Sequence, residues 1–108
     1  MKIIRDGYKI DIEGHAGYGA YGTDIVCAAA SMLFYTLAQT LNARSVDGFK
    51  VSESGDETIR RVECAPSADE REAVSVVYET IMHGFTALAS SYPEYVSLNE
   101  VHHESNHD

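Results

Sequence analysis

A histidine and a cysteine, His15 and Cys27, lie twelve positions apart at the two ends of a glycine-rich segment. A thiol becomes a nucleophile when a neighbouring base accepts its proton, and an imidazole can later return that proton to a leaving amine. The segment is flexible enough to fold His15 back toward Cys27. We therefore predict that Cys27 and His15 are the nucleophile and the base of a thiol-dependent catalytic site.

Glycines punctuate the segment that joins these two residues, and we expect them to let it close over a bound peptide. Three of them also spell G-x-G-x-x-G, the form of a dinucleotide-binding fingerprint. That fingerprint needs a parallel β-α-β unit with a strand buried on both faces, whereas residues 8–13 alternate as a half-exposed strand. We therefore expect a substrate loop and no cofactor, the loop glycines being Gly14, Gly17, Gly19 and Gly22.

A helix is predicted from Thr23, a natural N-cap, to about Ala43. Cys27 then lies at the end of the first turn, where the positive end of the helix dipole favours a thiolate. Asp24 fits two roles equally well, because it could orient the imidazole or complement the helix dipole. Ser31 follows Cys27 by one turn, so its hydroxyl is expected to bond either the site or its own helix backbone.

Strand patterns precede and follow this helix. Residues 8–13 alternate apolar and polar side chains, and the turn signal Asp6-Gly7 predicts pairing with residues 1–5. A second hairpin is predicted around the turn Ser54-Gly55-Asp56, with residues 58–64 as its second strand. Ile59 and Val62 have opposite parities in that strand, which suggests a bulge between them.

The C-terminal third predicts a second long helix, which starts at a capping box formed by Ser67 and Glu70 and ends near Tyr92. Val96 and Leu98 then alternate with polar residues, as in a short final strand. The element order ββαββα predicts an α+β fold: a two-layer sandwich, with two long helices on one face of a largely antiparallel sheet of four or five strands. Residues 1–101 are expected to form a single domain and 102–108 a polar tail.

The charge of the chain indicates which classes of partner this domain is expected to bind. The chain of 108 residues has 17 acidic and 8 basic side chains and a net charge of −9, which repels phosphate backbones and attracts basic peptides. The same acidity would also serve solubility alone. No apolar run approaches a membrane span, so we expect a cytoplasmic protein without a membrane partner, and Cys27 and Cys64 as reduced thiols.

Three histidines lie in the polar tail, without a framed carboxylate or thiol ligand beside them. We expect no metal site from them and read them as solvent-facing residues, the three being His102, His103 and His107.

The segments Gly14-His15-Ala16 and 22–31 make this chain similar to the Prp family of bacterial ribosomal-processing cysteine proteases. The resemblance is specific at the loop and first helix, and the rest agrees in length and element order. It implies that His15 and Cys27 are the catalytic pair, and that Asp24 and Ser31 support them.

The same resemblance implies a homodimer that removes the N-terminal extension of a large-subunit ribosomal protein. Members of the family cut after an aromatic residue, ahead of a lysine-rich mature N-terminus, which suits an acidic enzyme. Relatives in phage genomes would process capsid proteins instead. A different class of function also stays open: a non-catalytic ribosome-assembly or peptide-binding module, in which Cys27 is only a core residue.

Overall fold

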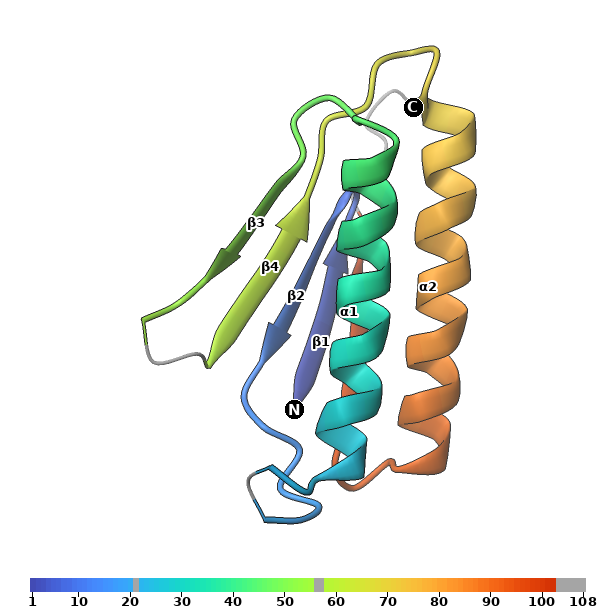
Figure 1. The fold of residues 1–108 in the computed structure, drawn as a ribbon. Coiled ribbons are helices and arrows are strands. Elements are labelled where there is room, and N and C mark those ends of the chain that lie inside the picture. Colours follow the sequence, from blue (N-terminus) through green and yellow to red (C-terminus); the bar gives the residue numbers. More distant parts are fainter. Residues whose placement is uncertain (21, 56–57, 103–108) are drawn as a thin grey trace.

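The computed structural model describes residues 1–20, 22–55 and 58–102. It contains five strands and two long helices, and both helices lie on one face of the sheet (Figure 1). The predicted two-layer α+β fold is confirmed. In chain order the elements are β1 (Lys2–Asp6), β2 (Lys9–Glu13), α1 (Ile25–Ala43), β3 (Lys50–Glu53), β4 (Ile59–Glu63), α2 (Arg71–Ser91) and β5 (Ser97–Val101).

The strand order across the sheet is β3-β4-β2-β1-β5. All neighbours pair antiparallel except β1 and β5, which are parallel. Each helix joins two strands that run the same way, α1 joining β2 to β3 and α2 joining β4 to β5. Because β2 and β4 run in opposite directions and their crossovers lead to opposite edges, right-handed connections place both helices on the same face.

The core lies between this helix layer and the sheet. Each helix buries a face of apolar side chains at three- and four-residue spacing, as an amphipathic helix must. Strands β1, β2 and β4 supply the opposing side chains. The largest fully buried side chains are Tyr78, Phe34, Phe85, Ile3, Ile10, Ile12, Leu37 and Leu41.

One detail of the predicted pattern was wrong. No bulge separates Ile59 from Val62, because β4 pairs continuously with β2 over its whole length. Val62 is buried against the helices, whereas Ile59 lies on the outer face with 43% of its surface exposed. A single exposed apolar residue of this kind is common on protein surfaces. In α1, Phe34 is fully buried, and its neighbour Leu33 is partly buried and packs against the core.

The outer face of the sheet carries a buried carboxylate, Asp11 on β2. It lies directly opposite Arg61 on β4 and accepts two hydrogen bonds from that guanidinium, at 2.6 and 2.9 Å. The hydrogen bond and charge of Asp11 raise the pKa of Arg61. A bidentate pair of this geometry fixes the register of β2 and β4 on a face that no helix covers.

The Ser67–Glu70 box is formed in part. The carboxylate of Glu70 accepts from the backbone N–H of Ser67 at 2.9 Å and from its hydroxyl at 3.2 Å. These bonds hold residues 68–70 in a turn, and α2 begins one residue later, at Arg71. The backbone bond of Ser67, more than those of its hydroxyl or its neighbours, lowers the pKa of the Glu70 carboxyl.

By length and composition α1 is long and apolar enough to cross a membrane. A search for unbroken apolar runs misses this, because polar side chains such as Ser31 and Thr36 interrupt the helix. Its buried residues pack onto the sheet and α2, as those of a core helix do. Within the predicted turn and tail, Asp56, His103 and His107 lie outside the described residues, and His102 is exposed.

Candidate active site

The N-terminus of α1 is organised by Asp24, which is the N-cap in place of the predicted Thr23. One carboxylate oxygen accepts from the backbone N–H of Val26 and Cys27, at 2.9 and 3.0 Å. The other accepts from Tyr18 and Gly19 in the preceding loop, at 2.9 and 3.1 Å. These bonds, that of Cys27 foremost, lower the pKa of the Asp24 carboxyl. Of the two predicted roles the structure therefore shows the capping role.

Thr23 is a neighbouring capping residue with a different partner. Its hydroxyl donates to the carbonyl oxygen of Ala20 at 3.0 Å, and so it stabilises the turn before the helix. Thr and Asp are both good N-caps, so two adjacent candidates leave the first residue of the helix undecided from sequence.

Cys27 is a half-buried residue in the first turn of α1, and its thiol is free. The backbone N–H of Ala16 donates to its Sγ at 3.2 Å. An N–H aimed at sulfur stabilises negative charge there, and the N-terminus of the helix acts in the same direction. His15 immediately precedes Ala16, so the contact that positions the loop against Cys27 also carries His15 to the site.

His15 and Cys27 line one cavity of about 590 Å³ at the end of the sheet where α1 begins. Its lining comes from the glycine loop, the first turns of α1 and the facing ends of β3 and β4. In Figure 1 the loop and the start of α1 lie at the lower edge of the molecule. All four predicted supporting and catalytic residues line it. Its lining residues are His15, Gly17, Gly19, Gly22, Asp24, Cys27, Ala28, Ser31, Tyr35, Glu53 and Arg60.

The glycine loop is held at several points. Tyr18 makes edge-to-face contacts with Tyr92 and Tyr95, with ring centroids 5.3 and 5.1 Å apart, and these fasten the loop to the end of α2. The nitrogen of Met1 donates to the carbonyl oxygens of His15 and Tyr95. The predicted loop glycines Gly17 and Gly22 have φ of +72° and +88°, a left-handed conformation that favours glycine.

Ser31 bonds neither Cys27 nor its own helix in the contacts that the structure describes. Its hydroxyl accepts from the guanidinium of Arg60 at 2.9 Å, and this guanidinium also lies over the ring of Phe34, 5.4 Å from its centroid. Sequence reasoning missed Arg60. The available signal was its parity, because Arg60 shares the inward face of β4 with buried Val62, and a charge on an inward face calls for a partner.

Three N–H groups at the start of α1 are already bonded. Those of Val26 and Cys27 donate to the side chain of Asp24, and that of Ala28 donates to the backbone carbonyl of Asp24. A substrate oxygen therefore competes with Asp24 at these three groups, or finds its donors elsewhere in the cavity.

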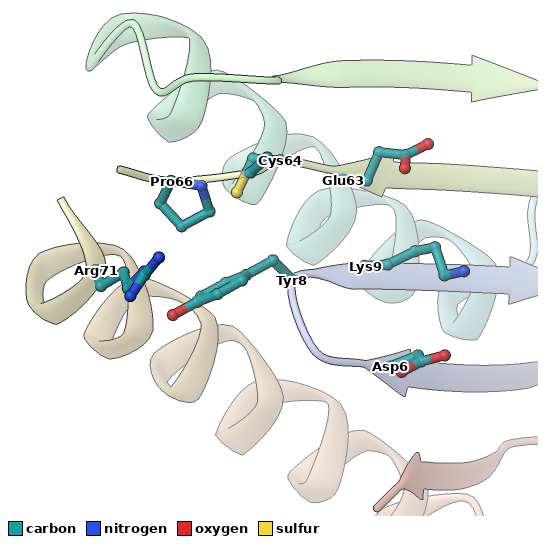
Figure 2. A pocket seen from close by; sticks show the side chains of 8 residues that line it. Asp6, Tyr8, Lys9, Glu63, Cys64, Pro66 and Arg71 are labelled. Atoms are coloured by element: carbon teal, nitrogen blue, oxygen red, sulfur yellow. The ribbon is translucent and has the colours of Figure 1, made fainter. Parts of the chain in front are cut away.

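Cys64 lies at the opposite end of the sheet, in a second cavity of about 570 Å³ that also contains Tyr8 and Arg71 (Figure 2). Burial is the main reason that the pKa of the Cys64 thiol is raised. Its Sγ lies 3.5 Å from the hydroxyl of Tyr78, whose pKa is also raised by burial. Cys64 therefore has the environment of an inert thiol.

Within the described residues, no three His, Cys, Asp or Glu side chains gather in a way that would hold a metal ion. The G-x-G-x-x-G motif follows β2, which lies between antiparallel neighbours. The motif thus has no adjacent parallel strand to complete a dinucleotide-binding β-α-β unit.

The fold of this chain occurs in solved structures. The ribosomal processing protease Prp of S. aureus with a covalently linked product peptide is 18% identical, with a TM-score of 0.77 over 93% of this chain and 96% of that one. SMU.848 of Streptococcus mutans is 28% identical, with a TM-score of 0.73 over 93% and 90%. The S. aureus protease with a substrate peptide is 17% identical, with a TM-score of 0.71 over 93% and 96%.

The family model "Cysteine protease Prp" matches residues 3–97. The chain belongs to this family, and it is a cysteine protease. The resemblance seen in the loop and first helix is confirmed. The comparison with curated proteins finds no match.

Proposed function

We propose that this protease removes the N-terminal extension of a large-subunit ribosomal protein, with Cys27 as the nucleophile and His15 as the base. One observation carries the proposal: both side chains line the same cavity, and the loop that bears His15 is bonded to Cys27 Sγ through Ala16 at 3.2 Å. The similar S. aureus structures are of a ribosomal processing protease with product and substrate peptides, which supports this class of substrate.

In the proposed reaction His15 accepts the proton of Cys27 Sγ, and the thiolate attacks the scissile carbonyl carbon. The tetrahedral intermediate collapses as the imidazolium gives its proton to the leaving amine, which leaves an acyl-enzyme thioester. Water, deprotonated by His15, then hydrolyses the thioester and restores the thiol. Asp24 supports this chemistry by holding the start of α1 and the loop in one geometry.

The charge of the protein fits a basic segment in the substrate. With a net charge of −9, the protein attracts a lysine-rich peptide over the distance at which encounters form. We also propose a homodimer, as the resemblance to the family implies, and a cytoplasmic location, as the sequence led us to expect. Light scattering on the purified protein tests the dimer, and the mass of a single chain would overturn that part of the proposal.

Cleavage of a ribosomal protein that carries its N-terminal extension tests the function directly. We expect the wild type to release the extension, and Cys27→Ala and His15→Ala each to lose cleavage by several orders of magnitude, since the two groups act as one unit. The matched control is Cys64→Ala, which removes the other thiol and is expected to cleave like the wild type. Retention of full cleavage in either active-site variant would refute the proposed pair.

A further inference from the structure

Arg60 is a cationic side chain in the cavity that the proposed dyad does not use. It is half-buried near the start of β4, and it faces the helices because it shares the inward face of the strand with Val62. Among the described residues that line the cavity, it is the one lysine or arginine. Because the protein has a net charge of −9, a positive charge in the cavity of the proposed nucleophile suggests a specific role for Arg60.

The guanidinium is fixed by two contacts from α1. One nitrogen donates to the hydroxyl of Ser31 at 2.9 Å, and the group lies over the ring of Phe34. An arginine held in this way can still donate further hydrogen bonds, because its planar guanidinium carries five N–H donors. The two contacts therefore orient the fork and leave donors for a ligand.

Among the described residues, no carboxylate forms an ion pair with this arginine. Glu53 lies directly opposite Arg60 in the β3–β4 register, the natural position for an ion pair, yet within the described part of the chain Arg60 forms no such pair. The carboxylate of Asp24, also in the cavity lining, accepts from four backbone N–H groups. Arg60 thus presents its charge to whatever enters the cavity.

Ser31 places this arginine relative to Cys27. Cys27, Ser31 and Tyr35 are four residues apart on one face of α1, and all three line the cavity. The guanidinium bonded to Ser31 is therefore about one helical turn, roughly 5 to 6 Å of helix axis, from the level of the nucleophile. A peptide that has acylated Cys27 would therefore pass within reach of the Arg60 guanidinium.

We propose that Arg60 is a substrate-binding residue that donates hydrogen bonds to an oxygen acceptor of the bound peptide, and that Ser31 is the positioning residue that aims it. This rests on the proposed function, in which a peptide occupies the cavity. The acceptor is a backbone carbonyl or the carboxylate of an acidic side chain near the scissile bond, because both fit the guanidinium fork. The inference gives Ser31 a role in binding rather than in proton transfer.

Alkylation of Cys27 tests the exposed charge without any peptide. Iodoacetate is anionic and iodoacetamide is neutral, so the ratio of their rate constants at Cys27, relative to that at a small thiol, reports the local charge. We expect Arg60→Met to lower the ratio of the iodoacetate to the iodoacetamide rate constant by about fivefold relative to the wild type, the size of one unit charge at close range in a hydrated site. Arg60→Lys keeps the positive charge, so its ratio should stay close to that of the wild type.

The variant Ser31→Ala separates positioning from packing. If Ser31 aims the guanidinium, its loss lowers the ratio of the iodoacetate to the iodoacetamide rate constant while the melting temperature stays near that of the wild type. Thermal unfolding of Arg60→Met is the matched check, since methionine keeps the apolar contact with Phe34. A ratio unchanged in Arg60→Met overturns the substrate-binding role of Arg60, and a ratio unchanged in Ser31→Ala overturns the positioning role of Ser31.

Peptide kinetics identify the acceptor. A backbone carbonyl predicts that Arg60→Met raises KM by a similar factor for an acidic peptide and for its Gln or Asn analogue, with a smaller effect on kcat. A side-chain carboxylate predicts a rise for the acidic peptide alone. An unchanged KM for both peptides overturns the proposal. If the wild type cleaves no ribosomal peptide, the proposed function fails. The alkylation ratio, which needs no peptide, still shows whether the charge of Arg60 acts at Cys27.

Discussion

At the scale of single residues, the two cysteines form a built-in comparison. Cys27 lies at a helix N-terminus with an N–H on its sulfur, whereas burial raises the pKa of Cys64 and keeps it a thiol at neutral pH. We expect iodoacetamide to label Cys27 faster than Cys64 in the folded protein, as followed by mass spectrometry of tryptic peptides. His15→Ala should slow Cys27 alone, and equal rates at the two thiols would contradict an activated Cys27.

Asp24 makes the stability of the protein depend on pH in the acid range. Its carboxyl pKa is lowered below the ordinary 3.8 in the folded state, so the stabilisation is complete above that value and is lost as the pH falls through the folded pKa. We expect Asp24→Asn to be less stable than the wild type at neutral pH in urea unfolding, with the gap closing as the solution is acidified.

The control for this prediction is Glu79→Gln, which neutralises an exposed carboxyl in the middle of α2. It should follow the wild type across the pH series. A gap between Asp24→Asn and the wild type that stays constant down to about pH 2, below the usual range of aspartate, would show that the charge of Asp24 contributes nothing.

Residue types and spacing identified the candidate chemistry, because His15, Asp24, Cys27 and Ser31 all lie in one short stretch that folds locally. Sequence did not identify Arg60, which follows Ser31 by 29 positions. Its hydrogen bond to Ser31 depends on how β4 pairs with β2, because that register places Arg60 opposite α1. Nor did the sequence show that Asp24 bonds the loop at Tyr18 and Gly19. Contacts between distant segments depend on a register that no single pattern fixes.

At the scale of elements, the close approach of the α1–β3 connection to the end of β4 depends on Gly48. Its φ is +72°, and a Cβ there would lie 2.8 Å from the backbone nitrogen of Ala65, which itself donates to Asp47. We expect Gly48→Ala to lower the free energy of unfolding by about 1–3 kcal/mol, measured in urea. Gly55→Ala is the matched control, because a Cβ there meets nothing within 4 Å; equal losses would contradict the explanation.

The elements also show which parts of a fold a pattern can predict. Alternation and helical spacing predicted both hairpins and both helices, since each pattern records which side of one element is buried. They did not show that β5 pairs in parallel with β1 at the sheet edge, because that placement follows from the α2 crossover over two intervening strands. Ile59 was misread for a related reason: one exposed apolar side chain has the same signature as a shift of register.

At the scale of the whole molecule, the acidic surface and the cationic cavity residue have opposite effects on a substrate. The net charge of −9 draws a lysine-rich segment toward the protein, whereas Arg60 repels a lysine from its own part of the cavity. If the substrate is the proposed ribosomal protein, its lysines are therefore expected to interact with the acidic surface outside the neighbourhood of Arg60. Long-range attraction of this kind is screened by salt far more than a contact inside a cavity.

This division predicts the salt dependence of cleavage. For a peptide with a lysine-rich segment, we expect kcat/KM to fall severalfold as salt rises from about 0.01 M to 1 M, because the screening length shrinks from about 30 Å to 3 Å. The same peptide with glutamine in place of lysine is the control and should change little. A parallel fall for both peptides would mean that salt acts on the enzyme itself, and a flat profile for both would mean that the charge of −9 serves solubility rather than substrate capture.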